Sequence, residues 1–77
     1  MNKQRRRRIA DLTSELDTLL ETLTDIRDEE QEAFDNMPES LQDSDRGQGI
    51  QDAIGTLDSA VDELGSIVDE ARNLSEG

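Results

Sequence analysis

Apolar residues recur in two stretches of the chain at alternating intervals of three and four. A mean interval of 3.5 residues places each set along one side of an α-helix, as in a coiled coil. The two ladders are Ile9, Leu12, Leu16, Leu19, Leu23 and Ile26, and then Ile50, Ile54, Leu57, Val61, Leu64, Val68 and Ala71. The pattern therefore predicts two long amphipathic helices.

Pro38, the only proline, lies between the two ladders. Proline breaks a helix interior and moves the preceding residue away from helical angles. We expect a first helix over about residues 6–35, a turn over about 36–43 and a second helix over about 44–73. A second helix that is continuous from Pro38 is the alternative. Residues 1–5 are expected to form a disordered basic arm, because arginines oppose the dipole at a helix start.

Both apolar stripes are wider than a coiled-coil seam. Leu20 and Phe34 widen the first stripe, and Ala53, Ala60, Ile67 and Leu74 widen the second. A hairpin of 77 residues leaves part of each stripe uncovered, so a monomer is short of apolar burial. The fold predicted for residues 6–76 is an all-α antiparallel two-helix hairpin, dimerising into a four-helix bundle.

The composition excludes most kinds of catalytic and metal-binding site. The chain has no cysteine and no histidine, which excludes disulfides, the usual zinc sites and Ser-His or Cys-His nucleophiles. Carboxylate pairs such as Glu29 and Glu32 need a cleft for acid–base catalysis, and a hairpin offers none. We expect a non-enzymatic protein without cofactor or metal.

No apolar run approaches the roughly 18 residues of a membrane span, and the start lacks a secretion signal's apolar core. We therefore expect a soluble, non-exported protein of the cytoplasm that does not contact membranes.

Charge is distributed unevenly along the chain. Twenty acidic and eight basic residues give a net charge of −12, yet five of the bases lie in the first eight residues. From Ile9 onward twenty acids face three bases, a net of −17. Such a surface repels nucleic acid and favours a partner protein with a basic surface. Mimicry of nucleic-acid phosphates is one way in which it could be used.

Two segments are candidate binding sites. The first is the hairpin apex, where a small apolar group is ringed by acids: Phe34, Met37 and Leu41 with Glu29, Glu30 and Glu32. The apolar group is interpreted either as a lid over the end of the bundle or as a partner-binding tip. The second is the run Arg5, Arg6, Arg7 and Arg8.

The arginine run has three interpretations. In a hairpin it lies near Asp69, Glu70 and Glu76, which could neutralise it within the chain. Arginines also bind nucleic-acid phosphates, although no aromatic residue is interleaved here for base stacking. An acidic protein or a second subunit is the third possibility.

The segment from Arg27 to Gln42 reads RDEEQEAFDNMPESLQ. It resembles the centre of short, uncharacterised acidic proteins encoded by tailed phages and prophages, with the pattern DEEQEAFDN-x-PESLQ-x-S-x-RG. Those proteins also have a basic start, a leucine-rich first helix and a second helix rich in acids and alanine, so the resemblance extends over the whole chain. Gly49, Gly55 and Gly65 depart from it. The resemblance implies a phage or prophage origin and a helical hairpin, without an activity.

The sequence therefore predicts a phage-type interaction protein, working as a homodimer. We expect it to bind and modulate, for example inhibit, a host protein through its acidic helical surface or its apex. The alternatives are a small RNA- or DNA-binding hairpin dimer that uses Arg5 to Arg8, and a structural assembly protein.

Overall fold

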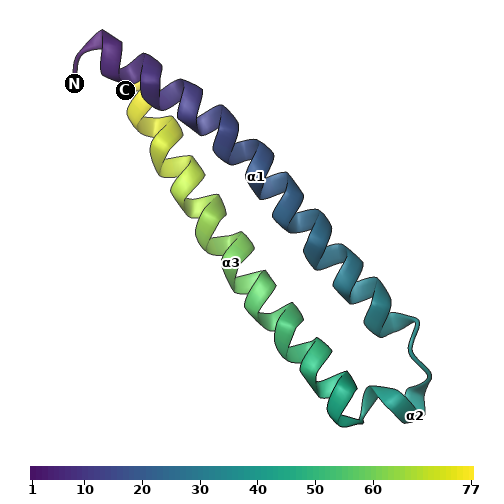
Figure 1. Cartoon of the computed structure of the whole chain (residues 1–77). Helices are drawn as coiled ribbons and strands as arrows, with labels where there is room; N and C mark the ends of the chain where they lie inside the picture. Colours follow the sequence, from purple (N-terminus) through teal and green to yellow (C-terminus); the bar gives the residue numbers. More distant parts are fainter.

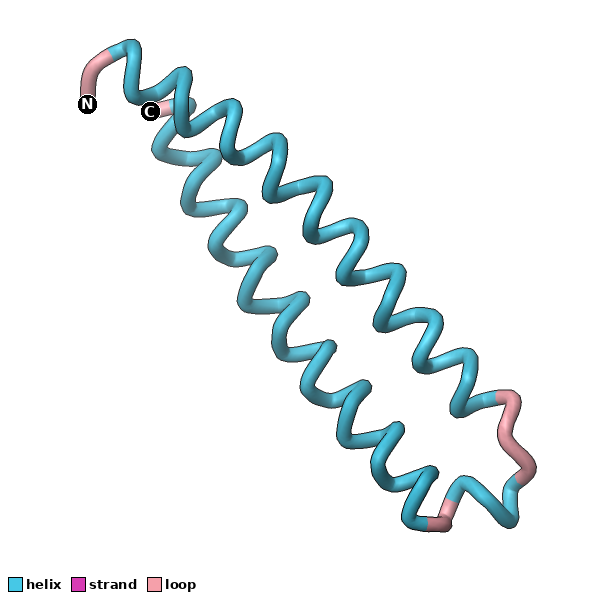
Figure 2. Tube along the Cα trace, in the orientation of Figure 1, coloured by secondary structure: helices cyan, strands magenta, loops and turns pink.

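The computed structural model describes residues 1–77 as an antiparallel helical hairpin 58 Å long (Figures 1 and 2). Helix α1 (Lys3–Asp35) packs along helix α3 (Asp45–Glu76), and the one-turn helix α2 (Glu39–Gln42) forms the corner between them. There are no strands. The predicted all-α two-helix hairpin is confirmed.

Helix α1 begins earlier than predicted. The Asn2 side chain accepts a hydrogen bond of 2.8 Å from the Arg5 backbone N–H. This cap satisfies one of the free N–H groups at the helix start and offsets the unfavourable arginine charges. Residues 3–5, expected to belong to a disordered arm, are instead the first turn of α1.

The corner separates α2 from α3. Helix α1 ends at Asp35, as the position of Pro38 predicts, and α2 occupies part of the expected turn. Ser44 then caps α3, because its hydroxyl oxygen accepts a hydrogen bond of 3.3 Å from the Gly47 N–H. The alternative helix that is continuous from Pro38 does not form. Helix α3 extends to Glu76, three residues beyond the expected end.

Gly47 allows α2 to lie close to α3. A Cβ atom at this position would lie 2.1 Å from the Gln42 carbonyl oxygen and 2.7 Å from the Leu41 carbonyl oxygen. Both neighbours are backbone atoms, so a side chain could not be accommodated without moving the corner. The glycine is therefore required by packing.

The two helices contact each other through different parts of their stripes. On α3 the predicted ladder is at the interface: Val68 is 2% exposed and the other six members are partly buried. On α1 only half of the ladder is at this interface, since Leu12, Leu19 and Ile26 are 51%, 59% and 46% exposed. The α1 interface residues are Ile9, Thr13, Leu16, Leu20, Leu23, Arg27, Glu30 and Phe34.

The reason for this difference is the width of the α1 stripe. Three apolar positions per heptad cover an arc of 100° or more, and a single neighbouring helix covers about two of them. The structure turns α1 so that Leu20 and Phe34 enter the interface. Only Thr13, Gly47 and Val68 are buried in the whole chain, so the core of a single hairpin is thin.

Candidate functional site

The predicted apex residues lie together at the closed end of the hairpin (Figure 1). We call residues 28–45 the acidic apex: they contain eight acidic and no basic side chains. Glu29 and Glu32 are exposed, and Glu30 is partly buried in the α1 interface. Of the eight acids only Asp28 forms an ion pair within the chain, 2.8 Å from Arg27. The negative charge of the apex is therefore largely uncompensated.

The apolar residues of the apex differ in their exposure. Phe34 and Met37 are partly buried, whereas Leu41 is 48% exposed. The Gln42 side chain closes the corner, because its Nε2 donates hydrogen bonds of 3.2 Å to the carbonyl oxygens of both Phe34 and Met37. Phe34 and Met37 are therefore the partly covered members of this group, and Leu41 is the member that is most available at the surface.

The arginine run lies at the open end of the hairpin, in the first turns of α1. These turns extend past the end of α3, as Figures 1 and 2 show. None of Arg5, Arg6, Arg7 and Arg8 forms an ion pair within the chain. Asp69 instead lies 3.8 Å from Arg72. The predicted neutralisation of the run by acids at the end of α3 is therefore absent.

Arg27 and Arg72 join the two long helices. Arg27 lies 3.1 Å from Asp58, and Arg72 pairs with Asp17. Hydrogen bonds to Asp58 and Asp28 raise the pKa of Arg27 above its ordinary value. These two cross-helix ion pairs show which residues of the two helices lie at the same level.

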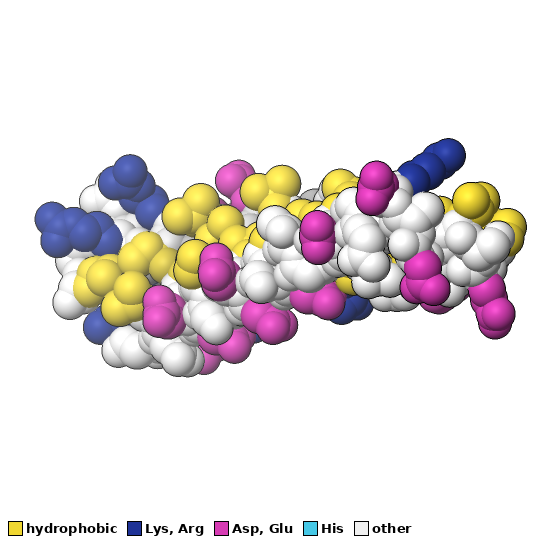
Figure 3. Space-filling model, turned by 90° about the horizontal axis from the view of Figure 1, so that it is seen from below, with side chains coloured by type: hydrophobic (Ala, Val, Ile, Leu, Met, Phe, Trp, Pro, Cys, Tyr) yellow, Lys and Arg dark blue, Asp and Glu magenta, His cyan; other side chains and the backbone are white.

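A third surface was not predicted as a site. Five large apolar side chains remain about half exposed on the long helices, and we call them the apolar flank: Leu12, Leu19, Ile26, Ile67 and Leu74. Figure 3 shows hydrophobic side chains, with acidic ones between them, along the length of one face; basic side chains are grouped at one end and also appear towards the other. The signal in the sequence was the presence of three apolar positions in each heptad, of which a two-helix interface covers about two.

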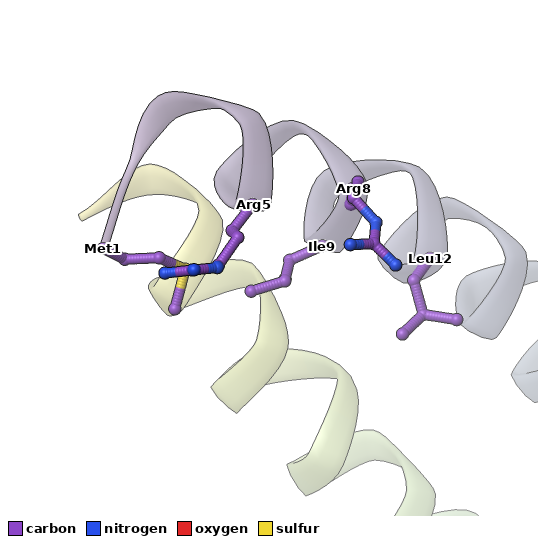
Figure 4. A pocket seen from close by; sticks show the side chains of 5 residues that line it. All are labelled: Met1, Arg5, Arg8, Ile9 and Leu12. Carbon is purple, nitrogen blue, oxygen red and sulfur yellow. The ribbon is translucent and has the colours of Figure 1, made fainter.

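The open end also carries a shallow hollow of about 420 Å³. Its lining combines Arg5 and Arg8 with Met1, Ile9 and Leu12, and Figure 4 shows these side chains close together on one side of α1. No group of three or more acidic side chains is placed to hold a metal ion. Neither long helix contains an apolar stretch that could cross a bilayer.

Comparison with known protein families, curated proteins and solved structures finds no match to this chain.

Proposed function

We propose that this chain is a non-enzymatic interaction protein of the phage or prophage type, working as a homodimer in the host cytoplasm. It binds a host protein with a basic surface through the acidic apex and thereby modulates, for example inhibits, that protein. The observation that carries the proposal is a cluster of eight acidic side chains with a single intrachain ion pair. Like charges held at one end of a rigid rod create a strong local field, which attracts a basic surface.

The apex also carries apolar contact area. Leu41 is 48% exposed in the middle of the acidic residues, and a buried apolar anchor within a charged rim is the usual arrangement of a protein interface. The charge brings the partner to the apex, and burial of Leu41 holds it there. A nucleic-acid-binding protein is one such partner, because its basic surface, which normally binds phosphates, is complementary in charge to the acidic apex.

Charge-neutral variants of the apex test the proposal. The variant carries Glu32→Gln, Glu39→Gln and Asp43→Asn, three exposed acids of the apex. The matched control removes three exposed charges away from the apex, through Asp11→Asn, Glu21→Gln and Asp62→Asn. Each protein is immobilised and exposed to host lysate, and captured proteins are identified by mass spectrometry.

The proposal expects a basic protein that the wild type and the control retain and the apex variant loses. Affinity for that protein should fall as salt is raised, because exposed charges are screened over about 10 Å at 0.1 M salt. Equal capture by all three proteins would refute a role for the apex.

A second candidate is nucleic-acid binding through the arginine run, favoured by its lack of intrachain ion pairs. Fluorescence anisotropy with labelled RNA and DNA distinguishes it. Phosphate binding requires an affinity that falls steeply with salt and is lost on Arg→Gln replacement at Arg6 and Arg7.

A further inference from the structure

The apolar flank lies on a single side of the hairpin. Each of its members directly precedes an interface residue, as Leu19 precedes Leu20 and Ile67 precedes Val68. When two helices pack antiparallel, the residues that directly precede interface residues lie on the same side of the hairpin in both helices. The residues that directly follow interface residues lie on the opposite side. Asp17 and Arg72 each follow an interface residue, and their ion pair spans that other side. The flank therefore faces away from this ion pair, and the exposed Glu15, Glu63 and Glu70, which also directly precede interface residues, lie along its edges.

The register aligns the flank into layers. The pairs Arg27–Asp58 and Arg72–Asp17 place Leu19 at the level of Ile67, to within one residue. By the same register Leu12 lies at the level of Leu74, and Ile26 at the level of the smaller Ala60. The apolar flank thus has two layers of large residues and a third layer with a large and a small one.

We propose that the apolar flank is the contact surface between two copies of this chain, packed antiparallel with their apexes at opposite ends. The inference rests on the proposed homodimer and specifies its face and direction. With a two-fold axis at the middle of α1, its 33 residues overlap their copy over about 50 Å, and α3 overlaps its copy over about 19 residues, or about 28 Å. At a width of about 10 Å per helix the area is on the order of 800 Å² per copy, the size of a standard stable interface.

The charges at the two ends select the antiparallel direction. Residues 1–8, at the open end, have five basic and no acidic side chains, while the acidic apex has eight acids and no base. A parallel dimer would place the two acidic apexes beside each other. An antiparallel dimer places each basic end near the acidic apex of the other copy, which is the electrostatically favourable arrangement.

The middle of the flank sets the register between the copies. Leu19 is the central residue of helix α1 (Lys3–Asp35), so a two-fold axis at Leu19 overlaps the whole of α1 with its copy. Leu12 then meets Ile26 of the second copy, and the large Leu74 meets the small Ala60. This alternation of large and small residues allows close packing.

The same register gives the arginine run a counter-charge. In the dimer, Arg8 lies at nearly the same height along the helices as Glu29 of the second copy, with an offset of one residue. Both side chains are exposed, both directly precede an interface residue, and neither has an ion pair within the chain. Arg5 lies one turn further out on the same side, where Figure 4 shows it beside Arg8 and the apolar residues. The first turns of α1, which extend past their own α3, are in this way supported by the second copy.

Single cysteines test the face and the direction, since the chain has none of its own. Under mild oxidation Leu19→Cys should form a disulfide-linked dimer, because the two-fold axis brings both copies of this residue together. The matched control is Thr18→Cys, the exposed neighbour on the outer side of α1. Mixing Leu12→Cys with Ile26→Cys should give the linked heterodimer, whereas a parallel dimer would link Leu12→Cys with Leu74→Cys.

Mass and charge reversal complete the test. Light scattering should give twice the mass of one chain, and Leu19→Lys should weaken the dimer about 30-fold or more by placing two charges at the centre of the contact. Arg8→Glu should weaken it about tenfold, and Arg8→Glu with Glu29→Arg should restore it.

Three results would overturn the inference: a monomer at all concentrations, equal linkage of Thr18→Cys and Leu19→Cys, or linkage of Leu12→Cys with Leu74→Cys. These measurements use the purified chain alone. Loss of host-protein capture by the apex variant is therefore a separate result. That variant should remain a dimer, because its three changes lie on the outer surface of α1 or beyond the part of the chain where α1 overlaps its copy.

Discussion

Replacement of Gly47 by alanine tests the corner on which the hairpin depends. In an ordinary helix interior this change is favourable by about 1 kcal/mol, because alanine has the higher helix propensity. Here the new Cβ would lie 2.1 Å from a backbone oxygen of α2, far inside the roughly 3.5 Å at which nonbonded heavy atoms rest. The α2–α3 corner must move by about 1 Å to relieve this overlap, since the blocking atoms belong to the backbone.

The magnitude follows from the two opposing effects. Overpacking costs about 1–3 kcal/mol, and the backbone contact places Gly47→Ala near the upper value. After subtraction of about 1 kcal/mol of helix propensity, the free energy of unfolding should fall by about 2 kcal/mol. For a domain of this size the melting temperature then falls by about 8–16 °C.

Gly49 supplies the matched control, two residues further along α3. Its Cβ position has no atom within 4 Å, so Gly49→Ala should raise the melting temperature by about 4–8 °C. Both variants are melted by far-UV circular dichroism at equal concentration, because association alone shifts the melting temperature. If Gly47→Ala stabilised the chain as much as Gly49→Ala, α2 would not pack on α3. A helix continuous from Pro38 would then be the better description.

Two further predictions concern the contact between α1 and α3. Val68→Ala should lower the melting temperature by about 8–16 °C, because it removes about 2 kcal/mol of burial free energy at the most buried side chain. A decrease of less than about 3 °C would contradict this packing. Arg72→Gln should cost only about 0.5 kcal/mol, because Arg72 and Asp17 are both roughly half exposed and their attraction is screened by salt. Urea denaturation measures it, and a loss above about 2 kcal/mol would show that the pair is more than a surface contact.

Some features of the candidate sites depend on neighbouring residues and could be predicted, whereas others depend on residues distant in sequence. That Phe34, Met37 and Leu41 would gather at an acidic apex could be predicted, because Pro38 ends α1 within a few residues of them. That Leu41 is the exposed member could not, since its exposure depends on how the Gln42 side chain closes the corner. The state of Arg5 to Arg8 also depends on a long-range feature, namely how far α1 extends past the end of α3.

Two long helices, their break at Pro38 and the uneven charge could be predicted from the sequence, because helical periodicity, proline geometry and ionisation are properties of neighbouring residues. The width of each apolar stripe, too great for one neighbouring helix to cover, could be predicted in the same way. Which edge of the α1 stripe is covered depends instead on how the two helices pack against each other. The large Leu20 and Phe34 turn towards α3, and Leu12, Leu19 and Ile26 are left at the surface. The physical reason is that the rotation of one helix about its axis is fixed by packing against the other, and residues distant in sequence supply that packing.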